Sequence, residues 1–441
     1  MNKLNKWPLI GCVVAAAVVA GCGGSGNSSS SASLRLVNAT LTHSSLDLLI
    51  NASVAIPATT QDSVSVAAAP SSGSVTLQIN DSNTATALVS SIVSLAGGQH
   101  YTVVAYESGG ALKTAALTED FVTPASGTAQ MRFYDASTDA GSLDVYVTTD
   151  TVTPWNVYLS SPIAAAPQAT VTADTSPTSS GWGLYTPGTY RVYVTGAGNK
   201  ADLRNGFLGT TVTLTSQQTA TVLLTPASGG LLVNGSTVIQ QGAYLALRNA
   251  TARVRLVGAV SANAVVAATA GSTTIDAGNV APTVGDYVIV PAPSVLAVNV
   301  NGTAVAPPAA TLTPGSDATL LVYGDPGAAT ASLIADDNRR PSVSTNVKLR
   351  LVNGITGMPG ALALSANFTT LASGVAAGAA SSYGLLAGST SMQIDVTSAL
   401  SPTELYHPTG LNVGSDKVYT LFMLGDFGTP RGVLVKDSKD R

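Results

Sequence analysis

Short runs of alternating apolar and polar residues make up most of the chain after residue 33. Residues 188–194 (GTYRVYV) and 391–396 (SMQIDV) place apolar side chains at every second position, which is the period of a strand with one buried face. Gly, Pro, Asn and Ser separate these runs, and no long run keeps a capped helical period. The pattern predicts an all-β protein and disfavours alternating βαβ units.

Three strand phrases recur in the same order along the chain. The first reads LRLVNA at 34–39, MRFYDA at 131–136, VRLVGA at 254–259 and LRLVNG at 349–354. A second follows it by 12 residues in the first two copies, as LDLLI at 46–50 and LDVYV at 143–147. A third leads from a turn into a strand late in every copy: GGQHYTVVAY (97–106), TSQQTATVLL (215–224), PGSDATLLVYG (314–324) and GSDKVYTLFMLG (414–425). Such repetition indicates about four copies of one unit.

Each unit holds several short strands over roughly a hundred residues, the size of an immunoglobulin-like β-sandwich. We therefore expect tandem Ig-like units at residues 34–124 (unit 1), 130–250 (unit 2), 252–341 (unit 3) and 346–441 (unit 4). Unit 2 is longer because it carries insertions. Residues 160–181 read as an exposed loop, whereas residues 226–250 allow either an extra hairpin or a strand bridging units 2 and 3.

The first 21 residues have the pattern of a secretory signal peptide. Lys3 and Lys6 precede an apolar stretch over 7–20, which is shorter than the ~20 residues of a spanning helix. Cleavage is expected between Gly21 and Cys22. Residues 22–33 then form a Gly/Ser tether.

The VAGC sequence at 19–22 resembles the lipobox of bacterial lipoproteins. The resemblance implies that Cys22 is acylated and that its partner is membrane lipid; the alternative is an ordinary signal peptide with an incidental cysteine. Gly23, rather than Asp, follows the cysteine, which under the enteric sorting rule implies the outer membrane, on either its periplasmic or its surface face. Cys12 would leave with the signal, so no intrachain disulfide is expected in the mature protein.

Charged residues make up only 10% of the 441-residue chain, and the formal net charge is −4. Soluble domains usually carry ~25% charged residues. A nucleic-acid footprint needs a basic face, so no nucleic-acid partner is expected. No Walker loop, nucleophile elbow or dinucleotide fingerprint occurs. We expect no catalytic residues and no cofactor.

The repeated phrases resemble a bacterial exported family, domain of unknown function 4397. In that family a Leu-Arg-Leu-Val-Asn-Ala strand, a Leu-Asp-Val-Tyr-Val strand and a Tyr-Thr-Val-Val strand recur. The resemblance covers nearly all of residues 34–441 and is strongest in units 1 and 2; in units 3 and 4, Ala267 and Leu362 or Ala363 replace the Asp. It implies Ig-like sandwiches on an exported, often lipid-anchored protein without established catalytic residues.

One arginine occupies the same place in the first phrase of every unit, at positions Arg35, Arg132, Arg255 and Arg350. We predict cross-strand pairs of Arg35 with Asp47 and of Arg132 with Asp144, whereas the other two arginines lack that partner. The alternative is a row of basic ligand contacts.

Three histidines, His43, His100 and His407, show no metal-ligand spacing. A weak calcium candidate lies at the joint between units 3 and 4, where Asp336, Asp337 and Asn338 offer oxygen ligands. A solvated linker is the alternative interpretation. No other metal site is expected.

Aromatic residues concentrate in unit 2. We select Trp155, Trp182 and Tyr185 as a candidate ligand surface, because exposed rings stack on sugars or dock partners. At strand spacing, such residues also serve as half-core residues. Exposed, coplanar rings would favour binding, and burial would favour a structural role.

These observations predict a non-enzymatic, lipid-anchored protein of the cell envelope with a structural or adhesion role. Its partner would be another envelope protein or a glycan. The alternative hypothesis is an array of carbohydrate- or polymer-binding modules at the cell surface.

Overall fold

The computed structural model describes residues 30–108, 110–149, 169–171, 178–206, 209–401 and 403–437. The regular structure in these segments consists of β-strands and two 3-10 turns, η1 (Thr138–Ala140) and η2 (Pro326–Ala328). The predicted all-β fold of tandem sandwiches is confirmed. The signal peptide, Gly21, Cys22, Trp155 and most of the insertion at 160–181 lie outside the described residues.

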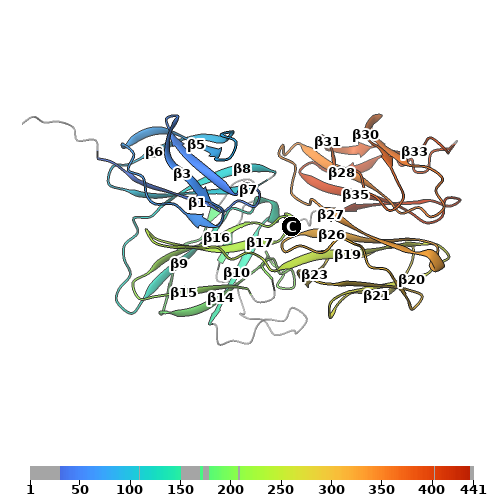
Figure 1. Ribbon diagram of the computed structural model, residues 1–441, viewed down its shortest axis with the longest axis horizontal. Coiled ribbons are helices and arrows are strands. Elements are labelled where there is room, and N and C mark those ends of the chain that lie inside the picture. The colour runs from blue at the N-terminus through green and yellow to red at the C-terminus, as the bar shows by residue number, and fades with distance from the viewer. Residues whose placement is uncertain are drawn as a thin grey trace, which may run out of the picture.

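The strands form four sandwiches, each with an inner sheet that faces another unit and an outer sheet (Figure 1). In unit 1 the inner sheet runs β4 (Ser63–Val64), β1 (Ser33–Asn38), β7 (His100–Ser108), β8 (Ala111–Thr118). The outer sheet runs β3 (Ser53–Thr60), β2 (Ser45–Ile50), β5 (Gly73–Asp81), β6 (Ala87–Leu95).

Unit 2 repeats this plan. Its inner sheet runs β12 (Thr178–Ser179), β9 (Ala129–Asp135), β16 (Thr219–Pro226), β17 (Val233–Ile239), β18 (Tyr244–Leu245), and β13 (Gly183–Tyr185) also pairs with β9. The outer sheet runs β11 (Ala169–Val171), β10 (Leu143–Thr149), β14 (Gly188–Gly196), β15 (Thr210–Leu214). Residues 226–250 therefore contain the β17–β18 hairpin, with β17 as the antiparallel neighbour of β16.

Unit 3 has an inner sheet of β22 (Thr283–Val284), β19 (Thr251–Val260), β26 (Asp317–Gly324), β27 (Thr330–Asp336), with β23 (Val288–Pro291) also on β19. The outer sheet runs β21 (Thr273–Val280), β20 (Val265–Ala270), β24 (Leu296–Val300), β25 (Thr303–Val305).

Unit 4 has an inner sheet of β31 (Gly384–Ala387), β28 (Asn346–Asn353), β35 (Lys417–Leu424), β36 (Arg431–Lys436). Opposite it lie β30 (Thr369–Val375), β29 (Leu362–Ala366), β33 (Ile394–Ser398) and the pair β32 (Ser389–Met392) with β34 (Leu411–Val413).

The first and third sequence phrases form the centre of every inner sheet. They pair in parallel as β1–β7, β9–β16, β19–β26 and β28–β35. A parallel pair needs a long crossover, and the outer sheet of the same unit supplies it. This pairing explains why the two phrases recur at opposite ends of each unit.

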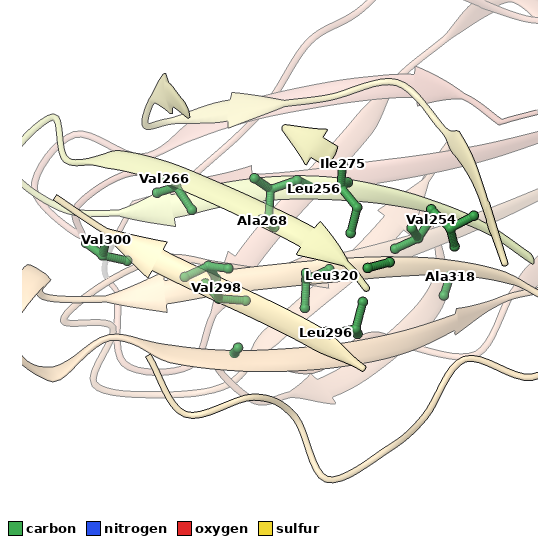
Figure 2. Packing of buried hydrophobic residues seen from close by; sticks show 14 of the residues in the cluster. Val254, Leu256, Val266, Ala268, Ile275, Leu296, Val298, Val300, Ala318 and Leu320 are labelled. Atoms are coloured by element: carbon green, nitrogen blue, oxygen red, sulfur yellow. The ribbon is translucent and has the colours of Figure 1, made fainter. Parts of the chain in front are cut away.

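Each sandwich has its own hydrophobic core between its two sheets. In unit 3, Val254 and Leu256 of the first strand face Val266 and Val298 of the outer sheet (Figure 2). Equivalent clusters fill units 1, 2 and 4. Burial of these small aliphatic side chains stabilises each unit at roughly 25 cal/mol per Å² of apolar surface.

The inner sheets also pack against each other, unit 1 on unit 2 and unit 3 on unit 4 (Figure 1). Between units 3 and 4, Val257, Leu321, Val352 and Phe422 form one cluster. The first strand of an inner sheet is therefore buried on both of its faces. In unit 3 this strand is β19, and all of residues 251–260 are buried. Units 2 and 3 are joined by backbone bonds, including Gly229 N to Gly315 O at 2.8 Å.

Candidate functional site

The four repeated arginines share one hydrogen bond. Each Nε donates to a threonine hydroxyl on the parallel neighbouring strand: Arg35 to Thr102 (2.7 Å), Arg132 to Thr221 (3.1 Å), Arg255 to Thr319 (2.9 Å) and Arg350 to Thr420 (3.0 Å). The strand register puts each arginine directly opposite its threonine. The threonine recurs in the third sequence phrase, so sequence comparison of the units could have found this pair.

The predicted pairs of Arg35 with Asp47 and Arg132 with Asp144 are wrong. Each arginine lies on an inner sheet and each aspartate on the outer sheet of the same unit. Asp47 accepts hydrogen bonds from Ala58 N (2.7 Å) and Ser82 Oγ (2.6 Å) instead. Asp144 accepts from Thr170 Oγ1 and Gly198 N, both at 2.7 Å. The arginines point away from their own cores and meet groups at the unit interfaces.

The repeated arginines of units 3 and 4 each donate to an aspartate of the other unit. Arg255 of unit 3 donates to Asp437 at the end of unit 4, and Arg350 of unit 4 donates to Asp336 at the end of unit 3. Each aspartate also accepts from the threonine of its own unit, Thr319 to Asp336 and Thr420 to Asp437. The two units are thus related like the halves of a symmetric dimer.

Burial and charge compete at this interface. Burial disfavours the charged form of Asp336, but Arg350 and Arg255 outweigh it and hold the pKa of Asp336 below its ordinary value. Burial acts against the charge of Arg350 too, but Asp336 and other neighbours raise the pKa of that guanidinium. Both groups therefore stay ionised at neutral pH.

Asp336 and Asp437, which accept hydrogen bonds from the repeated arginines, have an equivalent residue in each of the other units. In units 1, 2 and 4 the backbone N–H of this residue donates to the carbonyl oxygen of the residue two places before the threonine that bonds the repeated arginine. These bonds run from Glu119 N to His100 O, from Gln240 N to Thr219 O, and from Asp437 N to Val418 O. In unit 3 the register places Asp336 opposite Asp317. The four equivalents are thus Glu119, Gln240, Asp336 and Asp437, and unit 2 alone has an amide.

The amide changes the interface between units 1 and 2. The side chain of Gln240 accepts from Phe121 N (3.1 Å) and donates to Phe121 O (3.0 Å), so it binds the chain that leaves unit 1. Arg35 instead pairs with the carboxylate of Glu119 in its own unit, with Arg35 Nη2 2.6 Å from Glu119 Oε1. It also donates to the backbone of unit 2 at Ile239 O (2.8 Å) and Gly242 O.

Arg132 is left in a small recess, which we call the Arg132 slot. Its lining includes Glu119, Phe121, Arg132, Trp182, Thr221 and Gln240, and it has room for about one water-sized group. The guanidinium carbon lies 4.7 Å from the centroid of the Phe121 ring and 4.8 Å from that of Trp182. Burial is the main influence on Arg132 and lowers the pKa of its guanidinium, against the opposing effects of Tyr134 and Glu119.

The two aromatic candidates that the structure describes, Trp182 and Tyr185, do not form an open platform. Trp182 is half-buried, and its ring meets Phe121 at 62° with centroids 4.7 Å apart. Tyr185 is half-buried against the unit 2 core and packs edge-on against Tyr190. Burial raises the pKa of Tyr185 to about 12, and Tyr190 adds to the rise. Of these two candidates, Trp182 combines an aromatic ring with a charge, because the guanidinium of Arg132 lies over that ring.

Each of the three calcium candidate residues is ion-paired or hydrogen-bonded to other protein groups. Asp336 pairs with Arg350 across the interface. Asp337 pairs with Arg339 (2.7 Å) and Lys348 (2.9 Å), and Asn338 donates to Asp317 (2.7 Å). Both carboxylates are thus paired with cations of the chain, and the Tyr287 hydroxyl bonds to both Asp336 and Asn338.

A cluster on unit 4 was missed by sequence reasoning. Ligand atoms of Asp395, Glu404 and His407 lie within 4.8 Å of one another. His407 Nδ1 is 2.5 Å from Asp395 Oδ1 and 3.0 Å from Glu404 Oε2. A strand and the loop after it bring these residues together, so sequence spacing gave no signal. The ring nitrogen is engaged by both carboxylates.

Within the described ranges, none of the helical segments has the length and apolar character needed to cross a membrane.

Comparison with protein families finds a match over about a quarter of the chain, towards its N-terminus. Residues 32–146 match a family model described as "Domain of unknown function (DUF4397)". The match spans unit 1 and ends within β10 of unit 2. No curated protein matches the chain.

Several solved structures are distantly similar. A family 26 carbohydrate-binding module from Eubacterium rectale, in complex with maltoheptaose, has 10% identity and a TM-score of 0.16, covering 48% of this chain and 97% of its own. A family 41 module from a streptococcal virulence factor has 14% identity and a TM-score of 0.15, covering 43% and 93%. A putative cell adhesion protein from Bacteroides uniformis has 12% identity and a TM-score of 0.21, covering 48% and 99%. Scores and identities this low say nothing of what this chain binds.

Proposed function

We propose that the protein is a non-enzymatic, lipid-anchored component of the cell envelope, in which four packed sandwiches act as a structural or adhesion module. The reciprocal exchange of Arg255 and Arg350 between units 3 and 4 carries the scaffold part of this proposal. Buried charges that are paired across an interface hold two units in one orientation. A fixed orientation suits a protein that presents a surface.

The anchoring part of the proposal rests on the sequence. The apolar stretch before Cys22 and the Gly/Ser residues after it have the order of a signal, an acylation site and a tether. Several acyl chains on one cysteine supply the two anchoring signals that stable attachment requires. The acylated residue would hold the module at the outer membrane.

Metabolic labelling with a palmitate analogue tests the anchor. The wild-type chain should incorporate label and sediment with membranes, whereas Cys22→Ala should lose the label and be released. Cys12→Ala is the matched control and should keep both properties, because Cys12 lies within the signal. Label that persists in Cys22→Ala would refute the lipidation. Protease treatment of intact cells then distinguishes a surface from a periplasmic position.

A second candidate function is binding of a glycan or another polymer. The observation that favours it is the Arg132 slot, where a guanidinium is flanked by the rings of Phe121 and Trp182. Aromatic faces with a charged group beside them are a common arrangement for recognition of polar ligands.

A further inference from the structure

The four equivalent arginines differ in one respect. Arg35, Arg255 and Arg350 each donate to a carboxylate, which is Glu119, Asp437 and Asp336 respectively. For Arg132 the described part of the chain supplies the Thr221 hydroxyl as a hydrogen-bond acceptor but no hydrogen-bonded carboxylate. The chain thus offers three acidic groups to four arginines at these positions.

The difference follows from the residue at position 240. Asp437, the unit 4 equivalent, accepts the arginine of its partner unit, whereas Gln240 binds the backbone of Phe121. Glu119 then accepts its hydrogen bond from Arg35, and toward Arg132 it contributes only the attraction of its charge across the slot. In units 3 and 4, the carboxylate equivalent to Glu119 is Asp336, which pairs with Arg350, the equivalent of Arg132.

The Thr221 hydroxyl is a second possible hydrogen-bond donor at the Arg132 slot. Thr319 and Thr420 each accept from an arginine and donate their own proton to a carboxylate. Thr221 accepts from Arg132 in the same way, and within the described residues its proton, like that of Thr102, has no carboxylate acceptor. A guanidinium and a hydroxyl at one recess are the two donors that bind a carboxylate elsewhere in this protein.

We propose that the Arg132 slot binds the carboxylate of a ligand that is not part of this chain. The slot has room for about one water-sized group, so one carboxylate oxygen would enter it on the side of Arg132 and Thr221, away from Glu119, while the rest of the carboxylate stays at its mouth. The remainder of the ligand would lie outside, against the half-buried Trp182. Charge-assisted hydrogen bonds to a partly desolvated arginine are the strong class of such bonds, and the lowered pKa of Arg132 is consistent with burial that its neighbours only partly offset.

The carboxylate has two plausible sources: a free organic acid and an acidic sugar. Glucuronate and acetate therefore serve as the two probes, and glucose serves as the neutral control. A sugar acid that binds more tightly than acetate would identify contacts between its ring and Trp182. Equal binding would assign the affinity to the carboxylate alone. Both results support the slot as a carboxylate site.

Tryptophan fluorescence reports on the slot directly. The chain has three tryptophans, so the full-length Trp7→Phe, Trp155→Phe background leaves Trp182 as the single reporter. Glucuronate and acetate should change its emission in a saturable way, and glucose at the same concentrations should not. A response to glucose equal to that of glucuronate, or no response to either acid, would overturn the proposal.

Two substitutions in that background test the mechanism. Arg132→Gln should weaken carboxylate binding at least tenfold, and Arg431→Gln, an exposed arginine on β36, should leave it unchanged. Gln240→Glu restores the acid found in the other units. It should pair with Arg35, release Glu119 toward Arg132 and also weaken binding at least tenfold, and a cooperative unfolding transition verifies that the variant is folded although its bond to Phe121 O is lost. Wild-type affinity in a folded Gln240→Glu variant would refute the proposal. Because none of these measurements depends on Cys22, failure here is distinct from failure of the anchoring proposal.

Discussion

Arg255 Nη1 lies 2.5 Å from Asp437 Oδ1 across the interface between units 3 and 4, and both side chains are almost fully buried, at 1% and 0% exposure. Arg350 makes the reciprocal bond to Asp336. Desolvation makes such pairs poor sources of net stability, but removal of one partner leaves an uncompensated buried charge. The exchange therefore fixes how the two units sit together.

Asp437→Asn should destabilise the protein by about 3 to 5 kcal/mol, because Arg255 then stays buried without its counter-charge. The half-exposed pair of Arg248 and Asp62, at 2.6 Å, provides the control. Asp62→Asn should cost at most about 1 kcal/mol. Urea unfolding of both variants measures the difference, and equal losses would contradict the role assigned to the buried pair.

Asp336 predicts a specific dependence of stability on pH. Its pKa is lowered in the folded state, so its charge stabilises the fold above the unfolded value of about 3.9, and that stabilisation is lost as pH falls through the lower folded value. Asp336→Asn should therefore be less stable than wild type at pH 7, and the gap should narrow at pH 2 to 3. The pKa of Asp317 is raised by burial and also by the charge of Asp336, so Asp317 acts in the opposite direction in wild type and less strongly in the variant. A gap that is constant with pH would exclude the linkage.

Thr319→Val should cost about 1 to 3 kcal/mol, since Arg255 loses an acceptor and Asp336 loses a donor in a fully buried position. Thr213→Val is the matched control, because its exposed hydroxyl contacts only that of Thr189, at 3.1 Å. The same urea titration applies. A Thr319→Val variant as stable as the control would show that the Arg–Thr pair is energetically neutral.

Phe422 tests the packing between units 3 and 4. Its ring is fully buried in the inter-unit cluster with Val257 and Leu321, so Phe422→Ala should cost about 3 to 5 kcal/mol. Phe368 is 83% exposed, and Phe368→Ala should change stability by less than about 0.5 kcal/mol. Limited proteolysis should cut the Phe422→Ala protein faster between units 3 and 4. Cleavage rates identical to wild type would show that the two units dock without this cluster.

The strand pattern and the repeated phrases were enough to predict the fold class. The alternation in residues 188–194 corresponds to β14, and the repeated first phrase corresponds to β1, β9, β19 and β28. These features depend on local period and composition, which each segment carries by itself. The same reasoning found the four arginines, because each lies within a recurring apolar phrase.

The partners of those arginines could not be read from the sequence. Arg35 meets Glu119 at a separation of 84 residues and Arg255 meets Asp437 at 182, whereas the nearby Asp47 lies in the opposite sheet. Parallel pairing of the first and penultimate long strands, followed by packing of one inner sheet on another, brings these groups together. The alternation of apolar and polar residues is the same for a strand in either sheet. The sequence therefore predicts where the strands lie but not which strands they pair with or which residues their side chains contact. Only the tertiary structure showed that Arg35, Arg255 and Arg350 each meet a carboxylate, whereas Arg132, in the part of the chain that the structure describes, hydrogen-bonds to Thr221.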